Sequence, residues 1–168
     1  MVCPSLLSAA IPRLEEVELV CVRPGLSQLN AIFRSLEETE ELKLRYFNIS
    51  DNDLSMVDPR ILSAVICKLH QIDLLFVNLT EQQWASIFRA LSGSQRAKLS
   101  KLDVGNRVDF SRLQSPALAA ASVQLRELTV RNTALPPELC QQIFNKISQA
   151  DTSALRLRYL NIRENSIR

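Results

Sequence analysis

The sequence predicts an α/β fold built as one solenoid domain over residues 1–168, with parallel strands on a concave face and helices on a convex face. Three observations predict it. A short strand motif recurs along the chain, its spacing is most regular at a doubled period, and the segments between the motifs share helical patterns. Units of this kind bury their apolar faces jointly by stacking, and helices are wider than strands, so we expect the stack to curve into a horseshoe.

The strand motif is clearest near the C-terminus. There Leu157, Leu160, Ile162, Asn165 and Ile167 occupy every defined position of the pattern LxxLxLxxNxL. The same frame recurs with starts near residues 14, 44, 69, 99, 125 and 157. Because side chains alternate along a strand, the paired apolar residues of each frame lie on one face. Each frame therefore predicts a short strand with one buried face.

The spacing of the frames indicates two unlike repeats. Successive starts differ by 30, 25, 30, 26 and 32 residues, whereas alternate starts differ by 55, 55, 56 and 58. The repeats that start at 44 and 157 carry Asn52 and Asn165 at the asparagine position, and the one that starts at 99 carries Arg107. The other three repeats carry Val22, Val77 and Thr133 there.

Helices are expected between the strands. Three segments that begin at Leu26, Thr80 and Pro136 share one pattern, in which we expect these residues to line up in the interior: Phe33, Phe88 and Phe144. The alternate segments are residues 6–14, 61–69 and 111–123. Start signals agree, because Thr80 precedes Glu81, Asp58 precedes Pro59, and prolines occupy 136 and 137.

These features resemble the leucine-rich-repeat family, specifically its ribonuclease-inhibitor-like class, which alternates two repeat types. The resemblance covers about residues 5–168. It implies that Asn52 and Asn165 cap backbone groups where a strand ends, and that the protein binds another protein. Arg107 departs from the pattern, and the sequence after it holds an extra residue, which puts the local turn in doubt.

Neither end of the chain shows a polar capping unit. Three explanations are open: the chain is a fragment of a longer array, which we favour, it self-associates through its uncapped ends, or the last strand is short enough to be tolerated.

Composition points away from nucleic acid and membranes. The net charge is +2, glycine occurs 3 times, aromatic residues make up 5%, and no apolar stretch approaches a membrane span. The N-terminus lacks the features of a secretory signal. The four cysteines, at 3, 21, 67 and 140, form no CxxC pair, and we interpret them as reduced, mostly buried thiols of a cytoplasmic protein.

The sequence indicates no enzyme, cofactor or metal. The single histidine, His70, is expected in a turn or at a strand edge, without metal-ligand partners. Asp51 and Asp53 resemble the start of a calcium loop, but the glycine and terminal glutamate of that loop are missing, so we expect an exposed turn. Trp84 is expected to pack within the helix layer.

Strand residues that alternate with the core leucines should form columns on the concave face. We expect a protein partner to contact that face at these residues: Glu16, Glu18, Tyr46, Asn48, Asp73, Leu75, Phe76, Lys101, Asp103, Glu127, Arg131, Tyr159 and Arg163. Tyr46, Tyr159, Leu75 and Phe76 are the candidate anchors. Over the first five repeats the first two columns hold five carboxylates against Lys101 alone, which favours a partner that is basic toward the N-terminal repeats.

The leading hypothesis is therefore a protein-interaction module, of the kind found in the sensing regions of NOD-like receptors. One alternative is a regulator of a small GTPase, because Ran GTPase-activating proteins share this repeat class. A second alternative is a self-assembling structural element. An enzyme with chemistry of its own is the least expected class.

Overall fold

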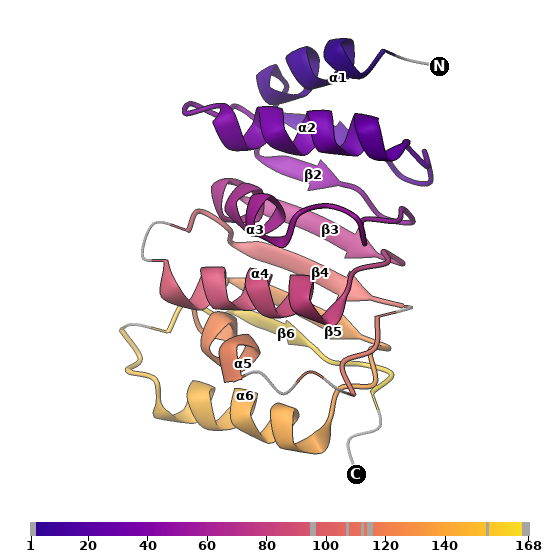
Figure 1. Cartoon of the computed structure of the whole chain (residues 1–168). Helices are drawn as coiled ribbons and strands as arrows, with labels where there is room; N and C mark the ends of the chain where they lie inside the picture. Colours follow the sequence, from indigo (N-terminus) through magenta and orange to yellow (C-terminus); the bar gives the residue numbers. More distant parts are fainter. Residues whose placement is uncertain are drawn as a thin grey trace.

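The computed structural model describes residues 3–94, 97–106, 108–111, 113, 116–153 and 155–165. In them the chain forms one all-parallel sheet of six strands that follow chain order (Figure 1). The strands are β1 (Glu16–Glu18), β2 (Tyr46–Asn48), β3 (Gln71–Leu75), β4 (Lys101–Gly105), β5 (Glu127–Arg131) and β6 (Tyr159–Asn161). The predicted α/β class and the predicted parallel strands are confirmed.

Helices cover one face of this sheet (Figure 1). They are α1 (Pro4–Ala10), the 3-10 turn η1 (Ile11–Arg13), α2 (Leu26–Glu38), α3 (Pro59–Lys68), α4 (Glu81–Gly93), α5 (Pro116–Ser122) and α6 (Pro137–Gln149). Strands that are neighbours in sequence are also neighbours in the sheet, so each crossover returns the chain over the same side. We call the opposite side of the sheet the open face.

The predicted helix starts are confirmed by their caps. Thr80 Oγ1 accepts from the backbone N–H of Gln83 at 3.2 Å, and Gln83 Oε1 accepts from the N–H of Thr80 at 2.7 Å. This reciprocal pair satisfies two donors that the first helical turn leaves free. Asp58 Oδ1 likewise accepts from the N–H of Arg60 at 2.7 Å. Helix α5 is shorter than its predicted segment, since it begins at Pro116 rather than near 111.

The core lies between the sheet and the helix layer. One residue of each strand forms a ladder in the core that the register aligns: Val17, Phe47, Ile72, Leu102, Leu128 and Leu160. The longer strands β3, β4 and β5 add a second row, Leu74, Val104 and Val130. Phe33 and Phe88 are fully buried, as expected. Phe88 packs against Phe110 with ring centroids 5.8 Å apart, and the buried Trp84 packs against both rings. The expected place of Trp84 in the helix layer is therefore confirmed.

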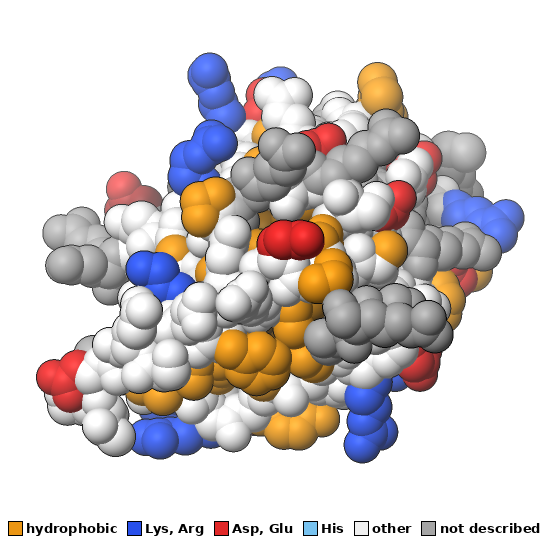
Figure 2. Space-filling view, turned by 90° about the horizontal axis from the view of Figure 1, so that it is seen from below, with side chains coloured by type: hydrophobic (Ala, Val, Ile, Leu, Met, Phe, Trp, Pro, Cys, Tyr) orange, Lys and Arg blue, Asp and Glu red, His pale blue; other side chains and the backbone are white. Residues whose placement is uncertain are grey.

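The expectation that Phe144 lies in the interior is wrong. Its side chain is 49% exposed, whereas Phe33 and Phe88 at the same phase are buried. Helix α6 packs against α5, and no further helix of the described chain covers its other side. The view from the α6 end of the stack shows apolar side chains gathered on this end (Figure 2). The repeat pattern thus predicts the face of α6 on which the ring lies. Burial of that face also requires a further helix packed against it.

The description of the cysteines as mostly buried is also wrong. All four are free thiols, but only Cys140 is buried, Cys67 is half-buried, and Cys3 and Cys21 are exposed. Cys3 precedes α1 at one end of the stack, and Cys21 lies in the first strand-end turn, which no earlier repeat covers. Burial raises the pKa of the Cys67 thiol to about 11. Among the described residues, no helix combines the length and apolar character needed to cross a bilayer.

Every strand is followed by a turn that contains a residue in the left-handed region at an equivalent position, and the turns after β1 and β5 contain a second one, Arg23 and Ala134. The residues at the equivalent position have φ between 50° and 59°: Cys21, Asp51, Phe76, Asn106, Asn132 and Glu164. The backbone N–H of each of the first five donates to a carbonyl of the next repeat, for example from Asp51 to Leu75 at 2.8 Å and from Phe76 to Gly105 at 2.9 Å. The hydrogen-bonded ladder therefore continues beyond the ends of the strands.

The side chain of Asn52 connects two of these turns by hydrogen bonds. Its Nδ2 donates to the carbonyl oxygens of Leu19 at 2.6 Å, Ile49 at 2.9 Å and Ser50 at 3.0 Å. Its Oδ1 accepts from the backbone N–H of Arg23 at 2.9 Å. The side chain is buried, so it satisfies backbone groups that water cannot reach.

Asn165 repeats this arrangement at the other end of the sheet. Its Nδ2 donates to the carbonyl of Val130 at 2.7 Å and to that of Ile162 at 3.0 Å. Its Oδ1 accepts from the N–H groups of Thr133 at 3.0 Å and Leu135 at 3.1 Å. The expected capping role of both asparagines is confirmed. Arg107, at the equivalent position of the third repeat, lies outside the described residues.

Candidate protein-binding face

Two columns of side chains run across all six strands on the open face. The strand register aligns the first column as Glu16, Tyr46, Gln71, Lys101, Glu127 and Tyr159. It aligns the second column as Glu18, Asn48, Asp73, Asp103, Thr129 and Asn161. Both columns match the sequence-based expectation, because in-register parallel strands place equivalent residues side by side. Whether a partner contacts these residues remains a prediction.

The third expected column is interrupted. Leu75, Gly105 and Arg131 are in register, but Ser50 is buried and its Oγ accepts from the N–H of Leu75 at 3.1 Å. Gly105 is buried as well. The exposed part of this column on the first three repeats is therefore Val20 and Leu75, followed by the exposed ring of Phe76.

Tyr46 is fixed across two strands. Its Oη donates to Asp73 Oδ2 at 2.8 Å, and Gln71 Nε2 lies 3.5 Å from Asp73 Oδ1. Burial, followed by the hydrogen bond to Asp73 and the charge of Asp73, raises the pKa of Tyr46 to about 12. The hydroxyl is therefore a hydrogen-bond donor at neutral pH, and it holds the ring in one orientation over β2 and β3.

Two carboxylates face one another at the centre of the open face. Asp73 on β3 is the register partner of Asp103 on β4. Burial, and then the charge of Asp73, raise the pKa of Asp103, while Arg131 and Lys101 act in the opposite direction. Asp103 Oδ1 and Arg131 Nε are buried atoms without a hydrogen-bond partner among the described residues. Like charges opposite one another are unfavourable in a sheet, so a contribution to stability does not explain why Asp73 and Asp103 are paired.

Arg131 occupies space that a glycine leaves free. A Cβ placed on Gly105 would lie 2.5 Å from the Arg131 carbonyl oxygen and 2.7 Å from Arg131 Cγ. The stem of the arginine therefore lies against the backbone of β4. Beside it, Lys101 Nζ lies 3.7 Å from Glu127 Oε2, and a shallow hollow of about 410 Å³ opens over β4 to β6.

Charge is divided unevenly along the open face. On β1 to β3 the first two columns hold Glu16, Glu18 and Asp73 and no lysine or arginine. The second half holds these charged residues on or directly after its strands: Lys101, Asp103, Glu127, Arg131 and Arg163. The open face is thus acidic over its first half and mixed over its second.

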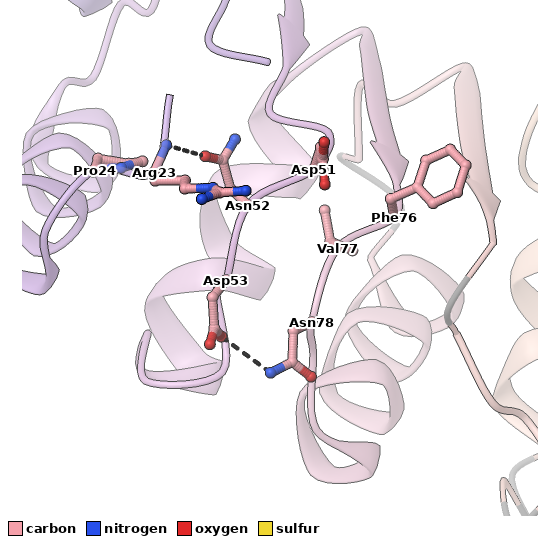
Figure 3. Close-up of a pocket in the computed structure, with 8 residues that line it drawn as sticks. All are labelled: Arg23, Pro24, Asp51, Asn52, Asp53, Phe76, Val77 and Asn78. Carbon is pink, nitrogen blue, oxygen red and sulfur yellow. Dashed lines mark hydrogen bonds between the residues drawn. The ribbon is translucent and has the colours of Figure 1, made fainter. Parts of the chain in front are cut away.

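A pocket of about 520 Å³ lies among the strand-end turns of the first three repeats, and sequence reasoning missed it (Figure 3). Its lining residues are Arg23, Pro24, Asp51, Asn52, Asp53, Phe76, Val77 and Asn78. Asn78 Nδ2 donates to Asp53 Oδ1 at 3.2 Å, which joins two neighbouring turns. No pattern in the sequence marks this pocket, because it forms between turns that lie about 25 residues apart.

His70 and the turn with Asp51 and Asp53 lie where the sequence predicted them. His70 is exposed just before β3, and its N–H donates to the carbonyl of Arg45 at 3.0 Å. Asp51 and Asp53 lie in a turn, and hydrogen bonding by the Ser55 side chain, followed by that of the Ser55 N–H, holds the pKa of Asp53 below its ordinary value. Within the described part of the chain, no group of three or more histidine, cysteine or acidic residues is placed to hold a metal ion.

No model of a known protein family matches this chain, and no curated protein sequence matches it. A family assignment therefore depends on the repeat and on its hydrogen bonds.

Proposed function

We propose that the protein is a leucine-rich-repeat module of the ribonuclease-inhibitor-like class, whose open face is the concave side of a curved stack and binds another protein. The doubled repeat period supports this assignment. So do the matching hydrogen bonds of Asn52 and Asn165, which reach back to the preceding strand in both cases.

One observation carries the binding proposal. Two registered columns of chemically varied side chains cover the open face, while the ladder that alternates with them is uniformly apolar. Packing restricts the apolar ladder to a few residue types, whereas the open face is free to vary. A rigid sheet that presents varied side chains in fixed rows is suited to recognising a protein surface.

The anchors for such a partner are the large side chains on or beside this face. Tyr46 is held by Asp73, and Tyr159 is 51% exposed on β6. Phe76 is 43% exposed at the end of β3. Aromatic side chains of this kind dominate the binding energy of many interfaces, because they bury a large area with little loss of side-chain freedom.

The test compares proteins captured from cell extract by three immobilised forms of the chain: the native protein, Tyr46→Ala with Asp73→Ala, and Gln141→Ala with Lys146→Ala on the exposed surface of α6. We expect proteins that bind the native and α6 forms but not the open-face variant, and calorimetry with such a protein in purified form should reproduce the difference. Circular dichroism checks that all three are folded. Identical capture by the three forms would remove the open face from consideration.

A further inference from the structure

An apolar rim borders the first half of the open face. We define it as Val20, Val22, Leu75 and Phe76. Val20 is 44% exposed, Val22 55% and Phe76 43%, and Leu75 is half-buried next to Phe76 in the chain. Ser50 and Asp51 of the second repeat lie between the two valines and this pair. The hydrogen bonds from Cys21 to Ser50 and from Asp51 to Leu75 hold these turns side by side. Exposed apolar groups gathered at one edge of a fold commonly mark a contact surface.

Turn geometry does not account for this rim. The turn after β3 requires a left-handed residue, and Phe76 occupies it at φ 55°. Asparagine suits this conformation far better than a bulky aromatic residue, and it occupies the same position at Asn106 and Asn132. The last three turns thus have a polar residue at the position where the third turn has the exposed ring of Phe76. Phe76 therefore occupies an unfavourable backbone conformation, which costs free energy.

The pocket among the strand-end turns opens beside the rim. Phe76, Val77 and Pro24 are its apolar lining residues (Figure 3). Asp51 and Asp53 add two carboxylates and Arg23 adds one guanidinium, so its charged lining is acidic by one charge. A pocket of about 520 Å³ that combines apolar walls with carboxylates can receive a large apolar side chain that has a cationic neighbour.

The acidic residues next to the rim also favour a partner segment with cationic groups. Glu16, Glu18 and Asp73 lie on the strands that lead into the rim, where the first two columns contain no lysine or arginine. This field attracts cationic groups and opposes phosphate, so it disfavours nucleic acid and anionic lipid as occupants.

We propose that the apolar rim and the acidic half of the open face together take one segment of a partner protein. An apolar side chain of that segment is seated against Phe76, and lysine or arginine residues next to it lie over Glu18 and Asp73. This inference rests on the proposed protein-binding function, and it restricts that function to the first three repeats and to a basic, amphipathic segment.

The experiment uses the full 168-residue chain and a random peptide library displayed on phage. Selected peptides are sequenced, synthesised with a fluorescent label and titrated by fluorescence polarisation. We expect sequences that combine an aromatic or large aliphatic residue with flanking lysine or arginine. A matched peptide with the same apolar residues and glutamate in place of each basic residue should not bind, and added salt should weaken binding of the basic peptide.

Two variants separate loss of binding from loss of folding. Phe76→Asn removes the ring and introduces the residue that other turns use at this φ, so the fold should be retained. Binding of the selected peptide should weaken by about tenfold or more. Glu164→Asn makes the corresponding change in the last turn and should leave affinity unchanged. Asp73→Asn should weaken binding and reduce its salt dependence.

The outcomes distinguish this inference from the proposed function. Peptides that tolerate Phe76→Asn but lose affinity with Arg131→Ala or Tyr159→Ala would overturn the inference and leave the proposed function intact. Peptides that are indifferent to all of these variants would count against both. Selection of acidic peptides, or of no binding peptide at all, would overturn the inference.

Discussion

The side-chain amide of Asn52 donates a hydrogen bond of 2.6 Å to the carbonyl of Leu19, which lies 33 residues earlier in the chain. The same amide reaches Ile49 and Ser50 within its own turn. One buried side chain therefore joins two consecutive repeats at the point where their strands end. This explains why an asparagine recurs at this position, since few other side chains offer two donors and an acceptor in so little space.

Asn52→Ala should lower the free energy of unfolding by about 2–3 kcal/mol, because it removes a partner from the buried carbonyl of Ile49 and from the part-buried backbone groups of Leu19 and Arg23. Urea denaturation followed by circular dichroism measures the change. Asn165→Ala should cost less, because Asn165 is only partly buried and water can replace its hydrogen bonds.

Asn145→Ala provides the matched control for this prediction. Asn145 is exposed on α6, and its replacement should change stability by no more than about 0.5 kcal/mol. Equal losses for Asn52→Ala and Asn145→Ala would show that the hydrogen bonds of Asn52 do not stabilise the stack.

Ala134 offers a test of the backbone conformation in the turns. It has φ 50° and is exposed, so replacement by glycine removes an unfavourable contact of Cβ without removing packing. Ala134→Gly should raise the free energy of unfolding by about 0.5–1 kcal/mol. Ala150→Gly, where φ is −68°, should instead lower it by about the same amount, because glycine adds freedom to the unfolded chain. Thermal and urea denaturation of the two variants should therefore differ in sign.

Much of this fold could be predicted from residue pattern alone. The alternation around Phe47 and Leu102 identifies both the buried ladder and the columns on the open face, because side chains alternate strictly along a strand. The start of α4 after its cap Thr80 was likewise predictable, since a capping residue satisfies donors within its own turn.

Features that depend on neighbouring repeats could not be predicted in this way. Phe144 and Phe88 share a phase on their helices, but only Phe88 has a covering layer. Phe76 has a low intrinsic preference for positive φ, and the turn imposes that conformation through hydrogen bonding to Gly105. Similarly, the unpaired oxygen of Asp103 depends on how side chains from three strands are oriented.

Gly105→Ala should destabilise the protein because its Cβ would lie 2.5 Å from the carbonyl oxygen of Arg131. A backbone atom cannot move aside as a flexible side chain does, so we expect a loss of about 1–3 kcal/mol. Gly93→Ala is the control, because nothing lies within 4 Å of a Cβ at that position. It should be neutral or stabilise by up to about 1 kcal/mol. Similar effects of the two substitutions in urea denaturation would mean that β4 and β5 can move apart at Gly105 without loss of stability.

The last prediction concerns the pKa of Asp103. Burial, followed by the charge of Asp73, raises this pKa above its ordinary value of 3.8. Between the ordinary and the raised value, the folded state binds more protons than the unfolded chain. The stability of the native protein should therefore fall as pH rises through this range. An asparagine side chain does not titrate, so Asp103→Asn should be more stable than the native protein at pH 7, and the difference should disappear once both states of the native protein are protonated.

Urea denaturation at pH 7 and at pH 3 measures this difference, with Glu127→Gln as the control. Glu127 is exposed and its pairing with Lys101 is a surface contact, so that substitution should change stability at pH 7 by no more than about 0.5 kcal/mol. A lower stability of Asp103→Asn at pH 7 would mean that attraction to Arg131 and Lys101 outweighs burial and the repulsion from Asp73. In that case Asp103 would belong to the structural network of the sheet, and its charge would be less free to meet a basic partner.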